Sequence, residues 1–150
     1  MTTVPPFQRA LEAHGDAVWR YLRGMVGACA ADDCFQETFI AALRAYPRLR
    51  PESNLRAWLL TIAHRKAIDH LRRQRREKLE PLDGELAAEP AGDGAIWSAV
   101  ATLPPRQRAS VLLRYGGDLR HREIAAAIGC SEEAARRSLH EGLKRLREML

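Results

Sequence analysis

The chain has 150 residues, of which 46% are hydrophobic, and a formal net charge of +5. This apolar fraction can fill a packed core and excludes wholesale disorder, and the length allows one domain or two small ones. Three scattered cysteines without a C-x-x-C pair favour reduced thiols over a disulfide framework or a zinc site. No apolar run approaches the 18 residues of a membrane span, so we expect a cytoplasmic protein without membrane insertion.

Charge is unevenly distributed along the chain. Residues 1–76 carry a net charge of +6, residues 77–95 carry −5, and residues 96–150 carry +4. Two basic blocks flanking an acidic spacer are compatible with an anionic partner. Helical periodicity in both blocks predicts an all-α fold with two small helical domains, 1–76 and 96–150, joined by an acidic flexible linker at 77–95.

The first block begins with one or two helices between about residues 6 and 27, followed by a short connection of small residues at 27–31. Asp32 and Asp33 are then expected at the start of the next helix, where acidic groups complement the helix dipole. That helix continues to about Tyr46 and is expected to bury five side chains: Phe35, Phe39, Ala42, Leu43 and Tyr46. Pro47 should end it, because proline cannot continue a helix, and residues 47–54 form a loop.

Residues 55–76 form the most basic segment of the chain. Its apolar residues recur at helical spacing, and its other face and C-terminal end are rich in arginine and lysine. Trp58 lies on the apolar face, which favours a core position over stacking on an unpaired base. Such a helix can pack with one face and hold a polyanion with the other, although a solvated basic surface helix would show the same pattern.

Helical periodicity returns after the spacer. Pro104-Pro105 starts a helix that Gly116-Gly117 ends, and residues 123–128 form a short helix before the break at 129–131. Ser131 is expected to cap a long helix that places Ala135, Leu139, Leu143 and Leu146 inward. This pattern indicates a helix-turn-helix whose second helix fits a DNA major groove. A plain αα-hairpin with a solvated basic face is the alternative.

Other chemistry has no pattern here. The chain lacks a nucleophile triad, a phosphate-binding G-x-x-x-x-G-K-S/T loop and an H-E-x-x-H motif, and its five histidines are dispersed. The acidic residues of the spacer could suggest a cation site, but their Pro/Gly spacing favours a solvated tether. We therefore expect no catalytic residues, no metal and no cofactor.

Three segments in this order resemble the extracytoplasmic-function (ECF) type of bacterial sigma factor, in the sigma-70 family. They are DDCFQETF at 32–39, L-x-x-WL-x-x-IA at 55–63, and LPPRQR at 103–108 leading to EIA at 123–125 and the Ser131 helix. Together they cover most of residues 7–147. The resemblance implies a non-enzymatic subunit that binds core RNA polymerase and directs promoter recognition, melting of the −10 element and transcription initiation.

The resemblance also implies roles for particular residues. Asp33, Gln36 and Glu37 match positions that dock on the clamp of the largest polymerase subunit. Six positions are implied in holding the single-stranded −10 element: His64, Arg65, Lys66, Arg72, Arg73 and Arg76. Six more are implied in binding the −35 duplex: Ser131, Arg136, Arg137, His140, Glu141 and Lys144. An anti-sigma protein is a further candidate partner.

The sequence departs from the family pattern at several positions, among them Arg136-Arg137-Ser138, where relatives often have Lys/Arg-Ser-Arg. Arg65 stands where many relatives have asparagine, and Glu141 where many have arginine, so their promoter preference does not transfer to this chain. Arg120 stands where relatives usually have a serine or threonine helix cap, and the loss of such a cap costs about 1 kcal/mol unless Asp118 substitutes. Two other functions stay open at this point: a stand-alone helix-turn-helix regulator, and a sigma-like decoy that sequesters a regulator.

Overall fold

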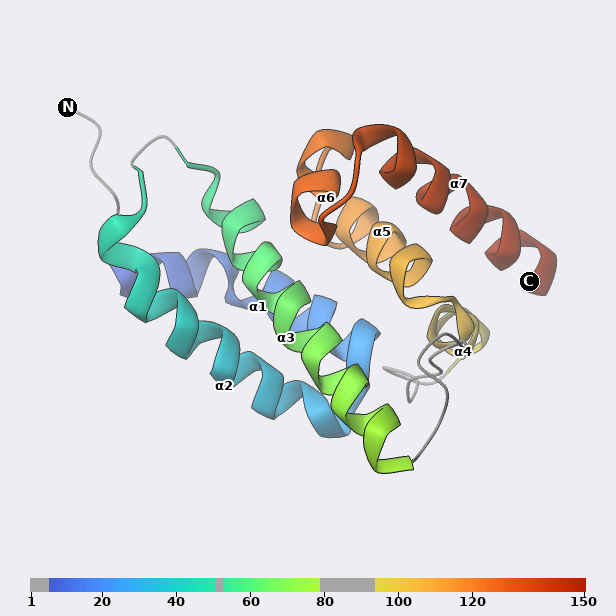
Figure 1. The fold of residues 1–150 in the computed structure, drawn as a ribbon, viewed down its shortest axis with the longest axis horizontal. Helices are drawn as coiled ribbons and strands as arrows, with labels where there is room; N and C mark the ends of the chain where they lie inside the picture. The colour runs from blue at the N-terminus through green and yellow to red at the C-terminus, as the bar shows by residue number, and fades with distance from the viewer. Residues whose placement is uncertain (1–5, 51–52, 79–93) are drawn as a thin grey trace.

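The computed structural model describes residues 6–50, 53–78 and 94–150. Within these ranges the chain is helical without strands, which confirms the all-α prediction (Figure 1). The elements in order are α1 (Phe7–Val26), α2 (Ala28–Ala45), the 3-10 turn η1 (Tyr46–Arg48), α3 (Leu55–Lys78), α4 (Ala95–Thr102), α5 (Pro105–Tyr115), α6 (His121–Ile128) and α7 (Glu132–Met149). Helix α2 ends just before Pro47, as predicted.

The connection between the first two helices is shorter than the sequence suggests. Helix α1 is continuous through Gly15, and only Gly27, with a φ of 86°, separates it from α2. Because α2 begins at Ala28, Asp32 and Asp33 lie in its second turn and not at its start. The expectation that these two carboxylates complement the helix start is therefore wrong.

Helix α3 packs against both α1 and α2, which also pack on each other, and completes a three-helix bundle (Figure 1). The predicted apolar stripe is confirmed, since Leu59, Ala63, Ala67 and Leu71 are buried. Leu60 is also fully buried although it lies beside this stripe. It is covered by the second half of the chain, which a helical period read within α3 cannot reveal.

The second half of the chain, α4 to α7, contains the predicted helix-turn-helix. Helix α6 starts at His121, two residues earlier than expected, and Gly129 makes the turn in the left-handed region with a φ of 76°. A small core of its own joins α4, α5 and α7 through Ala99, Val100, Leu103, Val111, Leu139 and Leu146. The predicted inward face of α7 is thus confirmed at Leu139 and Leu146.

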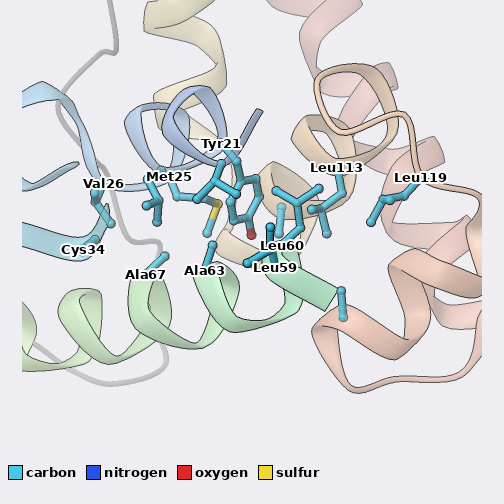
Figure 2. Packing of buried hydrophobic residues seen from close by; sticks show 14 of the residues in the cluster. Tyr21, Met25, Val26, Cys34, Leu59, Leu60, Ala63, Ala67, Leu113 and Leu119 are labelled. Carbon is cyan, nitrogen blue, oxygen red and sulfur yellow. The ribbon is translucent and has the colours of Figure 1, made fainter. Parts of the chain in front are cut away.

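The main hydrophobic core does not stop at the boundary between the two halves. It runs from α1, α2 and α3 into α5 and α6 as one cluster of buried side chains. Figure 2 shows Tyr21 and Leu60 on the first side of this boundary, and Leu113 and Leu119 on the second. Of the predicted linker, residues 79–93 lie outside the described ranges, whereas Glu77 and Lys78 continue α3 and Ala95 begins α4.

Candidate functional site

Helix α2 carries a polar and apolar stripe on its outer face. Asp33 and Gln36 are exposed, and Glu37 is half-buried. The stripe continues at helical spacing to Ile40 and Leu43, whose side chains are 51% and 55% exposed. The prediction that Leu43 is buried is therefore wrong. Two large aliphatic side chains held in water beside polar groups are typical of a protein docking surface.

The stripe on α2 can stay exposed because the residues on the opposite side of the helix pack it against the rest of the protein. Cys34, Thr38 and Ala42 are buried there, and the Thr38 hydroxyl donates to the Cys34 carbonyl oxygen at 2.7 Å. Burial, with the nearby Glu37 carboxylate, raises the pKa of the Cys34 thiol to about 11. Cys34 therefore serves as a packing residue on the buried side of α2.

Helix α3 presents a row of cations to solvent. Arg65, Arg72, Arg73 and Arg76 are exposed, and Lys66 is half-buried. Their spacing along one helix suits successive phosphates of a nucleic-acid strand. These five predicted positions are brought together on one element.

His64 lies apart from this row. Its ring is buried, and its Nδ1 atom lies 2.7 Å from the hydroxyl of Tyr21 on α1. Burial, with the charges of Arg65 and Arg72, lowers the pKa of His64 to about 4, so the ring is neutral at physiological pH. His64 thus joins α3 to α1 and lies on the buried side of α3, away from the exposed cations.

A basic recess of about 600 Å³ opens between the end of α2 and the start of α3. Trp58 forms one wall, half-buried and packed against Tyr46 at a ring-centroid distance of 6.2 Å. Three arginines surround the opening: Arg44, Arg48 and Arg50. An aromatic wall with guanidinium groups around it suits an unpaired base and its phosphate. These arginines were missed because two of them lie in a proline-containing turn and loop without periodicity.

The predicted recognition helix α7 is built as expected. The Ser131 hydroxyl accepts a hydrogen bond from the Ala134 backbone N–H at 3.1 Å and caps the helix. Arg137, His140 and Lys144 are exposed. They form an unobstructed polar face along the helix.

Two of the predicted α7 positions already have protein partners. Arg136 pairs with Glu132 at 2.8 Å on the helix surface, and Glu141 accepts from the Gln107 side chain of α5 at 3.3 Å. A solvent-exposed ion pair contributes little free energy, so Arg136 can exchange Glu132 for a phosphate at small cost. Glu141 is held toward α5, which explains how a carboxylate is accommodated on this face.

A second basic recess, of about 400 Å³, lies where α5, α6 and α7 meet. It is lined by Arg114, Arg120, His121, Arg122, Glu132 and Arg136. Four arginines, including Arg114 in the last turn of α5, surround the starts of α6 and α7 with a single carboxylate, and this arrangement suits a phosphate of duplex DNA. In the sequence, only the closely spaced basic residues at 120–122 indicate this recess.

The start of α6 is satisfied in an unexpected way. The Arg120 side chain does not cap α6. Instead, the Glu123 Oε1 atom accepts a hydrogen bond from the Arg120 backbone N–H at 3.0 Å. Asp118 does not take the capping role, because it lies 3.9 Å from the Arg56 guanidinium of α3. Hydrogen bonds from the Arg120 backbone N–H and from the Asn54 side chain lower the pKa of Glu123. Asp118 therefore does not substitute for the missing cap, and Glu123 satisfies the start of the helix instead.

An apolar groove of about 450 Å³ lies among α1, α4, α5 and α7. Its rim includes three partly exposed side chains, Ile96, Trp97 and Tyr115. Within the described residues no group of three histidine, cysteine or acidic side chains is arranged to hold a metal ion. No described helix is both long and apolar enough to cross a membrane.

Comparison with known proteins gives a consistent result over both halves of the chain. Residues 10–77 match the model of sigma-70 region 2, and residues 93–146 match that of sigma-70 region 4. The ECF RNA polymerase sigma factor SigC of Mycobacterium tuberculosis is 34% identical over 135 residues, covering 81% of this chain and 73% of SigC. The RNA polymerase sigma factor CarQ of Myxococcus xanthus is 30% identical, covering 96% of this chain and 88% of CarQ.

Two solved structures share the fold. The sigma factor RpoE in complex with the anti-sigma factor NepR, from Bartonella quintana, has a TM-score of 0.80 at 23% identity and covers 95% of both chains. CnrH in complex with the cytosolic domain of CnrY has a TM-score of 0.72 at 24% identity, covering 95% of this chain and 86% of CnrH. At these identities the likeness concerns the arrangement of helices.

Proposed function

This chain belongs to the sigma-70 family as an ECF-type sigma factor, an alternative sigma factor that directs promoter-specific transcription initiation, and we propose that three of its surfaces divide this work. The α2 stripe docks on core RNA polymerase, at the clamp of the largest subunit. The α3 cations hold the melted −10 strand, and α7 enters the −35 major groove. The domain boundaries that we propose are 1–76 and 96–150, and the phosphodiester chemistry belongs to the polymerase.

The single observation that carries the docking proposal is the exposed stripe of α2. A helix-turn-helix regulator working alone would not need Ile40 and Leu43 in water next to Gln36. Burial of two aliphatic side chains against a partner contributes several kcal/mol, at about 25 cal/mol per Å² of apolar surface. The polar residues of the stripe then fix the orientation of the partner.

For the −10 strand we propose that the recess beside Trp58 takes an unpaired base, while the α3 row takes phosphates. This assignment moves base capture away from His64, whose ring is engaged by Tyr21. The remaining five α3 residues keep the roles implied by the family resemblance. For the −35 duplex we add Arg120 and Arg122 to the proposed phosphate contacts of α7.

Binding of purified core polymerase to the full chain tests the α2 docking surface. Ile40→Ser with Leu43→Ser, and separately Gln36→Ala with Glu37→Ala, should weaken core binding at least tenfold. Asp16→Ala is the control, because it removes an exposed carboxylate from α1, outside the proposed docking surface. Equal affinity of all three variants for core polymerase would exclude α2 as the docking helix.

Run-off transcription on genomic promoters separates the three functions. A sigma factor makes core polymerase start at specific sites, whereas a stand-alone regulator binds duplex DNA without polymerase, and a decoy starts no transcription. An anti-sigma protein stays a proposed partner, supported by the sigma factor of the same fold that was solved bound to NepR. Inhibition of run-off transcription by the product of a neighbouring gene would identify it, and unchanged transcription would exclude that product.

A further inference from the structure

Helix α7 is covered along one side and exposed along the other. It packs chiefly on α5 and α6 and runs along the edge of the molecule (Figure 1). Its buried side consists of five residues: Ala135, Ser138, Leu139, Gly142 and Leu146. Arg137, His140 and Lys144 lie opposite that side and form the front of the helix, which we expect to face the base edges.

Two carboxylates stand beside this front, one on each flank of α7. Arg136 and Glu141 are five residues apart, which places them about 140° from each other around the helix axis. On the flank of Arg136 the carboxylate is that of Glu132, whose Oε1 atom accepts from the Arg136 guanidinium at 2.8 Å. The major groove is about 12 Å wide, and a helix with its side chains is about 10–12 Å across. Each flank of an inserted α7 therefore meets one of the two phosphate strands that line the groove.

Glu132 lines the basic recess where α5, α6 and α7 meet. The hydrogen bond from Arg136 lowers the pKa of Glu132, so its carboxylate is ionised at neutral pH. Arg136 can turn to a phosphate, but Glu132 remains in the same recess. The pair then brings no net charge to the strand, and its phosphate contact releases fewer counterions than that of a lone arginine would.

Glu141 is held on the other flank by α5. The Gln107 side chain donates from Nε2 to the Glu141 Oε2 atom at 3.3 Å. The two helices cross closely beside this contact, because a Cβ atom on Gly142 would lie 3.0 Å from Val111 Cγ2 and 3.4 Å from Gln107 Cβ. A glycine here lets α5 come near enough for Gln107 to reach Glu141, which keeps the carboxylate on its flank of α7.

We propose that Glu132 and Glu141 are specificity-determining residues of the −35 contact, which act by limiting the attraction of α7 to phosphate. The proposal deepens the proposed function and rests on it. Each carboxylate offsets one cation of the helix where a phosphate strand passes, and Gln107 positions Glu141 for this role. Contacts between the front and the base edges then supply a larger share of the binding free energy.

The two kinds of DNA respond differently to these carboxylates. On DNA without the −35 element, phosphate attraction supplies essentially all of the binding free energy, and the chain settles in the pose with the closest phosphate contacts. On the element itself, α7 must sit where its front meets the base edges, so a flank made neutral cannot move closer to its strand. Neutral flanks therefore strengthen binding to unrelated DNA more than binding to the element.

Fluorescence anisotropy of the full chain with two labelled duplexes tests the proposal. One duplex carries the −35 element of a promoter identified by run-off transcription, and the other carries the same bases in scrambled order. At low salt, a carboxylate about 6 Å from a phosphate weakens binding about threefold in water. Glu132→Gln with Glu141→Gln should therefore bind the scrambled duplex about tenfold more tightly, and the promoter duplex only about threefold more tightly.

The salt dependence of binding separates charge from structure. Each substitution should steepen the slope of log affinity against log salt by up to about 0.9, the value for one further neutralised phosphate. A disturbed fold alone would weaken binding and would not steepen this slope. Asp16→Asn is the charge-matched control, because it removes an exposed carboxylate from α1, outside the −35 surface, and should change neither slope nor affinity.

Gln107→Met tests how Glu141 is held, because methionine keeps the length of the side chain but not the amide. The released carboxylate can move toward its strand, so both duplexes should bind about twofold more weakly. Adding Glu141→Gln should remove this loss. A loss that persists in the double variant would show that Gln107 does not act through Glu141 and would overturn its positioning role.

Equal gains on the two duplexes, or no gain on either, would overturn the proposal for Glu132 and Glu141. An equal gain in Asp16→Asn would also overturn it, because the effect would then come from the total charge of the chain. Absence of binding to both duplexes by the wild type and by every variant would instead refute the proposed −35 function of α7.

Discussion

Among the charged residues that the structure describes, Arg108 should be the one whose replacement by methionine destabilises the chain most. The guanidinium is fully buried and donates to three backbone carbonyl oxygens, those of Met25 at 2.8 Å, Ala101 at 3.0 Å and Leu103 at 2.9 Å. Burial lowers the pKa of Arg108 to about 10, so it stays protonated at neutral pH. One cation thus completes the hydrogen bonding at the ends of α1 and α4.

The magnitude follows from these three acceptors. Methionine fills a similar volume, so packing changes little, but each carbonyl oxygen loses its donor at a cost of about 1–2 kcal/mol. Release of the buried charge from its desolvation penalty returns part of this free energy. We expect the free energy of unfolding to fall by about 3–5 kcal/mol, which is a large part of the 5–15 kcal/mol typical of a domain.

Urea denaturation followed by far-UV circular dichroism and tryptophan fluorescence measures this loss. With a slope of about 2 kcal/mol per M, the midpoint should move down by about 2 M. Arg108→Lys should lose about half as much, because an ammonium keeps the charge but not the planar fork. Arg106→Met is the control, since Arg106 lies two residues earlier on the same helix and is exposed. Equal costs for the methionine variants at 106 and 108 would refute the hydrogen-bond argument.

Three further predictions concern His64, Ser131 and Lys144. The pKa of His64 is about 4 in the folded chain and 6.5 in the unfolded chain, so below pH 6.5 the unfolded chain binds protons more strongly. The free energy of unfolding therefore decreases as the pH is lowered from 6.5 towards 4. Between pH 7 and pH 5 the wild type should lose about 2 kcal/mol more than His64→Gln in urea titrations, and equal losses would contradict this. Ser131→Ala should cost about 1 kcal/mol in thermal unfolding and Ser131→Asp much less, since aspartate also caps a helix; equal costs would exclude the cap. Lys144→Ala should lower the slope of log affinity against log salt for promoter binding by about 1, and an unchanged slope would place Lys144 away from phosphate.

Boundaries set by local chemistry could be predicted from the sequence. Pro47 ends α2, Gly129 makes the helix-turn-helix turn, and Ser131 caps α7, each through an interaction within four residues. The connection at Gly27 was predicted too long because the small residues that follow it are also good helix formers. Local signals therefore give the order of elements and most of their ends.

Features that depend on distant partners could not be predicted. His64 is buried because its hydrogen-bond partner Tyr21 lies 43 residues away, and a histidine in a basic segment gives no sign of that. Leu43 appeared to belong to the core because an apolar residue at helical spacing looks the same whether it packs internally or awaits a partner. Arginine side chains usually stay exposed, but Arg108 is buried because it donates to the backbone carbonyl oxygen of the distant Met25. No sequence pattern shows which backbone carbonyl oxygens need a side-chain donor.

The packing of α5 and α6 over Leu60 and other buried side chains of the first half also bears on how the chain is made. The first three helices are complete at Lys78, whereas Leu119 is added 41 residues later. At about 5–20 residues per second, the ribosome needs about 2–8 s to make that stretch. During this interval the growing chain carries a bare apolar patch that a neighbouring nascent chain or a chaperone can bind. The second half of the same chain therefore buries this apolar surface once it has been synthesised. Stalled or truncated translation products that lack the second half should be the species most prone to aggregate.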